Sequence, residues 1–441
     1  MIRIEDCFKF KEHPQCNAYK SITFRWNIIW NIPEFSVLEK CEQNPKWHFE
    51  GNVKKHVELV CKYAIKEVLL MSKKEDVEHD IYNIAMRTDE FETCYLEPSL
   101  FNVALTLLTA ALFHDIGKGV TTFKGKDGNW HAYNHENEGE KITRLLLWNE
   151  RVKFREDVCA LVKYHMLPLN IFERKNYLEE IIRVSYNIPS WALLLMLKRS
   201  DLEGSLQKDE ILKQRDRFIL DEVESITKEI GCYESKKLKS TFFKNRVSDS
   251  QRYLDNQYKK PLNIIVMLGV PGAGKDTFIN EKLIQDKKSD VESISVVNID
   301  RVENHNHTIN VLRKEDVAVI SRDAIRYELG YCKEGKKVVL DRKKEEKVSD
   351  EFKNRLYDAA SEGKTIILNN VNLKKEYRAE FARLLSNYDL HITYIYVEAS
   401  DFQKNVERRE GEIDAETLKN IIKKFDWPEH DEYDEFYYER T

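Results

Sequence analysis

The 441-residue sequence has no Cys-x-x-Cys pair, no unbroken apolar run of 18 residues and no visible internal repeat. Its eight cysteines are scattered, which favours free thiols in a reducing compartment over a disulfide framework. The first residues, MIRIEDCFKFKEH, contain no long apolar core. These absences argue against secretion and against a membrane span. We therefore expect a cytoplasmic protein without a membrane partner.

The sequence also carries little net charge, −5, although 33% of its residues are charged. No global field attracts it to nucleic acid, so any such contact must use local patches. With 42% hydrophobic residues the chain can bury an ample core, and its length predicts two or three domains.

Two kinds of periodicity divide the chain. Apolar residues recur at helical spacing up to about residue 230, which predicts an all-α domain over residues 1–235, with helices at 53–72, 101–114, 138–148, 155–164, 190–199 and 210–230. Residues 236–260 hold eight basic and two acidic residues and read as a basic connector, either a solvated linker or a strip that contacts nucleic acid. Residues 261–441 alternate strands with helices, which predicts an α/β domain with a parallel sheet, its strands at 264–268, 294–298, 317–320, 365–368 and 392–397.

The segment LNIIVMLGVPGAGKDTFI (residues 262–279) reads as a strand, a glycine-rich turn and a helix. Glycines let backbone N–H groups turn towards an anion, and the helix N-terminus adds its dipole. Lys275 would reach the β- and γ-phosphates of a nucleotide, while Asp276 stands where Ser or Thr usually binds Mg²⁺. The pattern predicts a nucleotide site made by Gly269, Gly272, Gly274, Lys275, Asp276 and Thr277.

Two residues that could act on a phosphoryl acceptor follow the strand at 317–320. Asp323 comes at the carboxyl end of this strand, where ligands of parallel sheets bind, and can accept the proton of an attacking hydroxyl. Arg326 lies one helical turn further and can bind a phosphate of the acceptor. Alternatively, Asp323 only caps the next helix and Arg326 is solvated.

The helical half contains an ordered set of metal-binding residue types, H…HD…H…H…D. Imidazoles and carboxylates suit Mn²⁺, Co²⁺, Ni²⁺ or Zn²⁺, and two bridged ions can activate a water and stabilise a phosphoryl oxygen. Each histidine alone could equally be a packing residue, and His48 and His131 compete for the same roles. The set consists of His56, His114, Asp115, His135, His165 and Asp201.

This order resembles the HD superfamily of metal-dependent phosphohydrolases, and WHFEGNVKKH looks like the entry helix of HD domains in CCA-adding enzymes. The resemblance implies that His135 and His165 hold a second metal and that Lys118 contacts the phosphate. It also implies a primary metal site formed by His56, His114, Asp115 and Asp201. The arginine often found after the last Asp is missing, and Arg199 is the nearest replacement.

The segment RDAIR (residues 322–326) resembles the R-D-x-x-R of polynucleotide 5′-kinases in phage and bacterial end-healing enzymes. By that resemblance Asp323 is the general base, and Arg408 and Arg409 belong to a lid that neutralises the transferring phosphoryl group. Their D-x-T-N segment looks like NNVN here, with Asn369 in the Asp position, which leaves Mg²⁺ ligation open.

The two halves together resemble the HD-Pnk end-healing enzymes over roughly residues 48–428. The resemblance implies ATP- and Mg²⁺-dependent phosphorylation of RNA 5′-OH ends and metal-dependent removal of 2′,3′-cyclic, 2′- or 3′-phosphates. It further implies a bacterial or phage source and an RNA ligase acting downstream. Two alternatives stay open. One is a mononucleotide kinase fused to an HD nucleotidase, since GKDT also resembles phage deoxynucleotide kinases, and the other is a regulatory C-terminal half.

Overall fold

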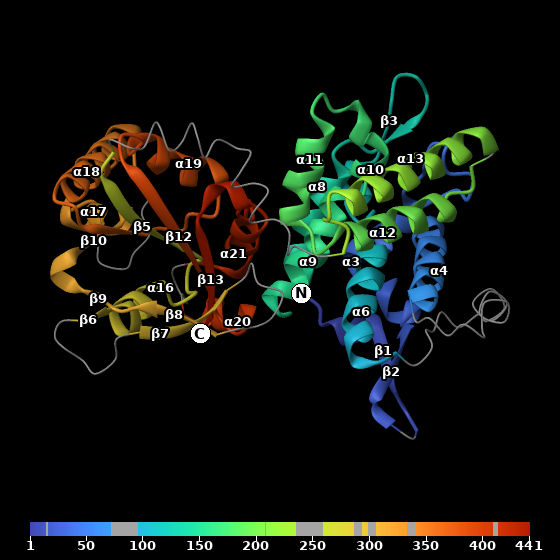
Figure 1. Cartoon of the computed structure of the whole chain (residues 1–441), viewed down its shortest axis with the longest axis horizontal. Coiled ribbons are helices and arrows are strands. Elements are labelled where there is room, and N and C mark those ends of the chain that lie inside the picture. The colour runs from blue at the N-terminus through green and yellow to red at the C-terminus, as the bar shows by residue number, and fades with distance from the viewer. Residues whose placement is uncertain are drawn as a thin grey trace. The chain divides into compact units, whose positions relative to one another are not determined.

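The computed structural model divides the chain into two compact units, Met1–Thr241 and Phe242–Thr441 (Figure 1). Most of the expected basic connector, up to residue 258, lies outside the described residues. The structure describes residues 1–14, 16–71, 96–207, 209–234, 259–285, 293–298, 306–332, 340–408 and 413–441.

The N-terminal unit is mainly helical, as its 3.6-residue periodicity predicts. Its longer helices are α4 (Val53–Met71), α6 (Pro98–Phe113), α8 (His135–Leu146), α9 (Val152–Tyr164), α11 (Tyr177–Asn187), α12 (Trp191–Gly204) and α13 (Glu210–Glu229). Short helical turns lie between them, including α7 (Lys118–Thr121) and α10 (Leu167–Asn170).

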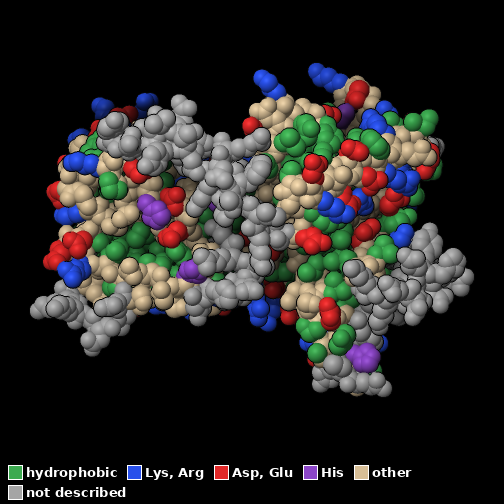
Figure 2. Space-filling view, viewed as in Figure 1, with side chains coloured by type: hydrophobic (Ala, Val, Ile, Leu, Met, Phe, Trp, Pro, Cys, Tyr) green, Lys and Arg blue, Asp and Glu red, His purple; other side chains and the backbone are tan. Residues whose placement is uncertain are grey.

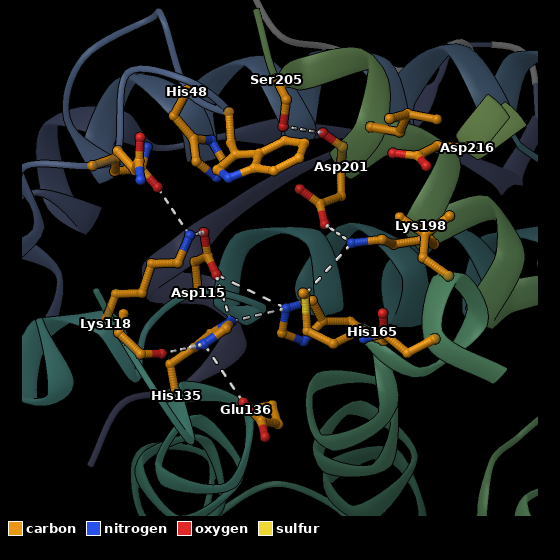
Figure 3. Close-up of a pocket in the computed structure, with 18 of the residues that line it drawn as sticks. His48, Asp115, Lys118, His135, Glu136, His165, Lys198, Asp201, Ser205 and Asp216 are labelled. Carbon is orange, nitrogen blue, oxygen red and sulfur yellow. Dashed lines mark hydrogen bonds and ion pairs between the residues drawn. The ribbon is translucent and has the colours of Figure 1, made fainter. Parts of the chain in front are cut away.

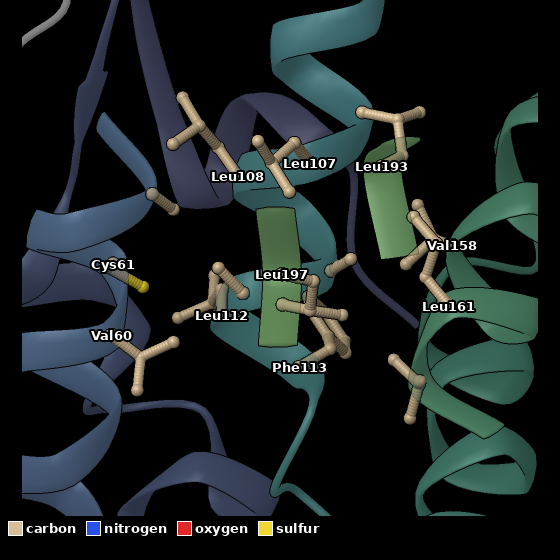
Figure 4. Packing of buried hydrophobic residues seen from close by; sticks show 14 of the residues in the cluster. Val60, Cys61, Leu107, Leu108, Leu112, Phe113, Val158, Leu161, Leu193 and Leu197 are labelled. Atoms are coloured by element: carbon tan, nitrogen blue, oxygen red, sulfur yellow. The ribbon is translucent and has the colours of Figure 1, made fainter. Parts of the chain in front are cut away.

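Helix α6 forms the centre of the core of this unit. It packs against α4, α9 and α12, and apolar residues cover most of its circumference, as expected for a helix buried on several sides. Figure 4 shows Val60 of α4, Leu112 of α6 and Leu197 of α12 turned towards one another, all fully buried. Each such side chain contributes about 1.5–3 kcal/mol through burial, so the core fixes the helices that carry the expected site residues.

Helix α6 with the turn after it is also apolar enough to resemble a membrane span. The segment Pro98–Thr121 passes by length and composition, but 72% of its most apolar window is buried inside the unit, as in the core helix of a folded domain.

Two antiparallel hairpins in this unit escaped the sequence analysis. Strands β1 (Phe8–His13) and β2 (Cys16–Phe24) pair near the N-terminus, and β3 (Phe123–Lys124) pairs with β4 (Trp130–His131). In FKFKEH the apolar residues alternate over too few positions to stand out from the helical pattern around them.

The C-terminal unit is built on a seven-stranded sheet in the order β10-β11-β5-β12-β13-β7-β8. The pairs from β10 to β13 are parallel, and β7 and β8 continue the sheet with antiparallel pairing. The strands are β5 (Pro261–Leu268), β7 (Ser293–Asn298), β8 (Asn306–Asn310), β10 (Val317–Ile320), β11 (Thr365–Asn369), β12 (Asp389–Glu398) and β13 (Glu435–Arg440).

The sheet confirms the expected α/β architecture and adds two strands, β8 and β13. Residues after Asp426 read as an acidic, aromatic tail, yet β13 pairs in parallel with β12. In the sheet, β11 and β10 lie on one side of β5, and β12 and β13 lie on the other side. Strand order therefore reverses at β5, and parallel sheets bind ligands at the carboxyl ends of strands at such a point. The helices between the strands are α17 (Arg322–Glu328), α18 (Arg342–Ser361), α19 (Lys375–Leu384), α20 (Phe402–Glu407) and α21 (Ala415–Ile422).

The distribution of surface charges and the state of the cysteines agree with the small net charge and the scattered cysteines of the sequence. On the visible face of each unit, acidic and basic side chains are interspersed (Figure 2). No disulfide joins the cysteines whose side chains the structure describes, which are Cys7, Cys41, Cys61, Cys159, Cys232 and Cys332.

Candidate metal centre and nucleotide site

The six expected metal-binding residues of the N-terminal unit converge from five elements. His56 lies in the first turn of α4, and His114 and Asp115 follow α6. His135 is the first residue of α8. His165 caps the C-terminus of α9, and Asp201 lies in the last turn of α12. All six are buried.

The first cluster contains His56, His114, Asp115 and Asp201. The Nε2 atom of His56 lies 3.3 Å from Nε2 of His114 and 3.0 Å from Oδ1 of Asp201. The Oδ2 atom of Asp115 lies 3.5 and 3.4 Å from the same two ring nitrogens. Ligands about 2.1 Å from one metal ion stand about 3.0–3.4 Å apart in octahedral or tetrahedral geometry. The Oδ1 atom of Asp201 lies farther from Nε2 of His114, at 3.8 Å. The spacings among His56, His114 and Asp115 suit a single divalent ion.

The second cluster uses the other oxygen of Asp115. Its Oδ1 atom lies 3.3 Å from Nε2 of His135 and 3.9 Å from Nε2 of His165, and the two rings are 3.3 Å apart at Nε2. Figure 3 shows Asp115 between Lys118 and the His135–His165 pair. Asp115 can therefore bridge two ions, one at each cluster.

Backbone contacts indicate which nitrogen carries the proton in three of the four histidine rings. The Nδ1 atoms of His114, His135 and His165 each lie 2.7–2.8 Å from the carbonyl oxygen three residues earlier. Because a carbonyl only accepts, Nδ1 donates and Nε2 presents its lone pair to the cluster. With this assignment, two lone pairs face each other across 3.3 Å between His135 and His165, an arrangement that a cation between them would stabilise. Burial lowers the pKa of His165 well below its ordinary value, which keeps it in the neutral, ligating form.

Two glycines allow the helices to approach closely enough for these clusters. A Cβ on Gly117, in the turn after α6, would meet the backbone oxygen of His135 at 2.0 Å. A Cβ on Gly204 of α12 would lie 2.9 Å from the backbone nitrogen of Val60 on α4. The first contact brings the turn to the N-terminus of α8, and the second brings α12 to α4. Any larger residue would separate the elements that carry the ligands.

Glu50 supports the first cluster from behind and was not expected from the sequence. Its Oε1 atom lies 2.9 Å from Nδ1 of His56 and 2.8 Å from Nδ1 of His48. Burial alone would raise the pKa of Glu50, but hydrogen bonds from the two histidines lower it well below its ordinary value. Burial would lower the pKa of His56, but hydrogen bonds to Asp201 and Glu50 raise it to about 9. Glu50 thus orients His56 as outer carboxylates orient metal-binding histidines.

The two competing histidines lie outside the clusters described above. Burial lowers the pKa of His48 to about 4, and its ring faces Glu50. His131 lies on the β3–β4 hairpin, where Nε2 is 3.0 Å from Oδ1 of Asp127.

Two lysines compensate the carboxylates. Lys118, expected to contact phosphate, lies 2.7 Å from Oδ2 of Asp115, and Lys198 lies 2.7 Å from Oδ2 of Asp201. Burial would raise the pKa of both carboxyl groups, but these lysines and the neighbouring histidines lower it well below the ordinary value. Arg199, suggested as the missing arginine, instead pairs with Asp221 and Glu224 on α13, 3.0 and 2.5 Å away. That suggestion was wrong, and Lys198 is the cation beside the last Asp.

A pocket of about 910 Å³ opens over the second cluster and reaches Asp201 (Figure 3). His56 and His114 lie beneath its lining, fully buried. The volume lies in the range of small-molecule sites. Basic, acidic and aromatic groups share the lining: Lys118, Lys198, Arg215, Glu42, Glu136, Glu173, Asp216, Trp47, Trp130, Tyr133 and Phe172.

In the C-terminal unit, the turn after β5 contains the three glycines expected to form a phosphate-binding loop. Gly269, Gly272 and Gly274 have φ angles of +149°, +79° and +95°, which favour glycine. A Cβ on Gly269 would lie 2.4 Å from the carbonyl oxygen of Val397 on β12. Lys275 opens the short helix α16 (Lys275–Thr277), and its Nζ donates to the carbonyl oxygen of Gly269 at 2.8 Å. The lysine therefore lies against the loop that it is expected to serve.

The expected acceptor residues lie in the first turns of α17. Ser321 caps this helix, so the alternative in which Asp323 is the cap is wrong. The Asp323 side chain is 87% exposed, and Oδ1 lies 2.5 Å from Nη1 of Arg326. Arg326 is also held by Glu345 at 3.1 Å.

Two further expectations concern the lid and the magnesium ligands. Arg408, directly after α20, donates to the carbonyl oxygen of Gly272 at 3.1 Å, so it lies at the loop, while Arg409 lies outside the described residues. Asp276 and Asn369 meet, with Nδ2 of Asn369 donating to Oδ1 of Asp276 at 2.6 Å. Thr277 is the exposed last residue of α16.

Comparison with known families assigns a type to each unit. Residues 77–218 match the HD domain, a range that includes His114 and Asp201 but begins after His56. Residues 262–434 match the family described as chromatin associated protein KTI12, and β13 lies beyond this range. No curated protein matches the chain. The chain therefore joins a region similar to HD phosphohydrolase domains to a region similar to the P-loop kinase-like domain of KTI12.

Proposed function

We propose that the protein heals RNA ends, with one activity in each unit. The C-terminal unit transfers the γ-phosphoryl group of ATP to a 5′-OH end. The N-terminal unit removes a 2′,3′-cyclic, 2′- or 3′-phosphate. The products, a 5′-phosphate and a 3′-OH, are the ends that an RNA ligase joins, and we propose such a ligase as the partner acting next.

The N-terminal clusters suit metal-dependent phosphate hydrolysis. Their imidazole and carboxylate donors fit Mn²⁺, Co²⁺, Ni²⁺ or Zn²⁺, and two such ions supply an activated water and neutralise charge on the phosphoryl group. Lys118 and Lys198 line the pocket and can bind the remaining phosphate oxygens. Trp47, Trp130 and Tyr133 offer rings on which the terminal bases of a strand can stack.

The C-terminal residues suit phosphoryl transfer, which depends on positioning and charge neutralisation. The loop from Gly269 to Gly274 and Lys275 would hold the phosphates of ATP with Mg²⁺. Asp323 would accept the proton of the attacking hydroxyl, and Arg326 would bind a phosphate of the acceptor. Arg408, already at the loop, would neutralise the transferring group, and Arg409 belongs to the same proposal.

The observation that favours a polynucleotide acceptor is the exposure of Asp323. A kinase for mononucleotides encloses the nucleobase of its acceptor. A kinase that acts on the end of a nucleic-acid strand needs an open approach to its general base. At 87% exposure Asp323 is open to a large acceptor. The GKDT spelling keeps the mononucleotide kinase fused to an HD nucleotidase as the second candidate.

The choice of acceptor tests the proposal. The full chain with labelled ATP and Mg²⁺ is offered a 5′-OH RNA oligonucleotide, AMP or dCMP. We expect labelling of the RNA at a rate at least tenfold above that of either mononucleotide. Ready phosphorylation of AMP or dCMP with no labelled RNA would instead support the nucleotide-metabolism enzyme.

A further inference from the structure

The two positions at which the C-terminal unit departs from the expected magnesium ligands meet in space. Asp276 replaces the Ser or Thr after the loop lysine, and Asn369 replaces the carboxylate at the end of β11. They are 93 positions apart, yet Nδ2 of Asn369 donates to Oδ1 of Asp276 at 2.6 Å. Strand β11 pairs with β5, placing Asn369 opposite Met267 just before the loop. The departures are therefore one local change.

The exchange preserves the donor set that magnesium needs. P-loop enzymes usually hold Mg²⁺ with a neutral hydroxyl after the lysine and a carboxylate from the sheet. Here the carboxylate follows the lysine and the neutral oxygen comes from the sheet. The hydrogen bond uses the amide nitrogen of Asn369 and leaves its Oδ1, together with Oδ2 of Asp276, as hard oxygen donors. One negative charge remains in the pair, as in the usual arrangement.

The new place of that charge has a consequence for nucleotide binding. A carboxylate directly after Lys275 would stand close to the phosphates of a nucleotide held by the loop, and two negative groups at short range repel one another. A divalent cation between them turns this repulsion into attraction on both sides. A hydroxyl at the same position would impose no such requirement.

We propose that Asp276 and Asn369 form an exchanged magnesium-binding pair that makes nucleotide binding by the C-terminal unit dependent on a divalent cation. The inference rests on nucleotide binding by the loop, which is part of the proposed function, and does not depend on the acceptor.

The test compares the affinity of the full chain for fluorescent ADP in Mg²⁺ and in EDTA. Wild type should bind at least tenfold more tightly with Mg²⁺. Asp276→Thr, with no carboxylate in the pair, should bind more tightly than wild type in EDTA and show a Mg²⁺/EDTA ratio below about threefold. The double variant Asp276→Thr/Asn369→Asp should restore the wild-type ratio. Lys275→Ala identifies binding elsewhere in the chain, and Asp350→Asn, an exposed carboxylate on α18, should behave as wild type.

A wild-type ratio in Asp276→Thr would overturn the inference, and so would a double variant that folds, by an unchanged circular dichroism spectrum, without regaining the ratio. Absence of Lys275-dependent ADP binding in wild type would overturn both this inference and the kinase proposal. Mg²⁺-dependent binding without RNA phosphorylation would support the inference and contradict only the end-healing function.

Discussion

The two candidate sites differ most in how their charged groups are held. In the N-terminal unit His56 and His114 are fully buried and Asp115 is 2% exposed, and backbone contacts fix three of the four rings. In the C-terminal unit Asp323 is 87% exposed and its neighbour Arg326 shares its charge with Glu345. A metal site needs donors fixed in a dry interior. A site for the end of a polymer needs side chains that can leave an ion pair within the protein and bind the substrate. The comparison predicts that substitutions in the first site alter metal content and stability, and those in the second alter chemistry alone.

The largest effect is expected from His114→Ala. It removes a ligand from the first cluster and opens a cavity in the core, so phosphate release should fall more than about 100-fold, beyond the loss typical of an outer partner. The metal content of the purified chain, measured by mass spectrometry, should fall in parallel. His131→Ala, a histidine outside the clusters, should keep wild-type metal content. Full metal content in His114→Ala would contradict the assignment.

Glu50→Gln should have the next largest effect. It removes the charge that orients His56 without removing a ligand, so metal affinity should weaken about 10–100-fold. Competition with a chelating dye measures this directly. Glu39→Gln, an exposed carboxylate that pairs with Lys54, is the matched control. Equal affinities in the two variants would show that Glu50 only fills space.

The pH dependence of metal binding should reflect the raised pKa of His56. With a pKa of about 9, its Nε2 holds a proton at neutral pH that a metal must displace. Affinity should therefore rise about tenfold per pH unit from 7 to 9 and then level off. When a chelator removes the metal, the stability of the fold should change with pH in the opposite direction. Protonated His56 stabilises the fold fully below the ordinary histidine pKa near 6.5, and this stability is lost as the pH rises through 9. A flat affinity profile would contradict the raised pKa.

The smallest expected effect distinguishes the roles of two neighbouring basic residues, Lys198 and Arg199. Lys198→Met removes the charge-assisted bond to Asp201, so kcat/KM for phosphate release should fall about tenfold. Arg199→Met breaks ion pairs on the outer side of α12, each worth about 0–1 kcal/mol, and should leave hydrolysis unchanged. Equal losses in both variants would remove Lys198 from the site.

The sequence predicts the fold class because it follows from local patterns. The six candidate metal-binding residues were instead proposed from their order along the chain and its resemblance to the HD superfamily. Helical periodicity, the strand alternation after residue 260 and the glycine-rich loop are each readable within about twenty residues. The elements it misses are the short hairpins β1–β2 and β3–β4, in which apolar residues alternate over few positions, and the strands β8 and β13. The composition of β13 resembles that of a tail.

The residues that support the ligands were harder to predict because their roles depend on the direction in which their side chains point. Lys198 lies three positions before Asp201 and so shares its face of α12, whereas Arg199, two positions before, points away. That spacing was a readable signal which residue type alone obscured. Glu50 stands between two histidines in HFEGNVKKH, but only the fold shows that Nδ1 of His56 faces it. The Asp276–Asn369 contact joins positions 93 apart, which a single sequence does not reveal.

The most direct test of the account follows both ends of one RNA carrying a 5′-OH and a 2′,3′-cyclic phosphate, with ATP, Mg²⁺ and Mn²⁺. Wild type should convert the 5′-OH to a 5′-phosphate and should remove the cyclic phosphate to leave a 3′-OH. Asp323→Ala should lose 5′ labelling by about 10²–10⁴-fold, as expected for a general base, and still process the 3′ end. His114→Ala should do the reverse. Loss of both activities in each single variant with the fold intact would contradict two independent sites.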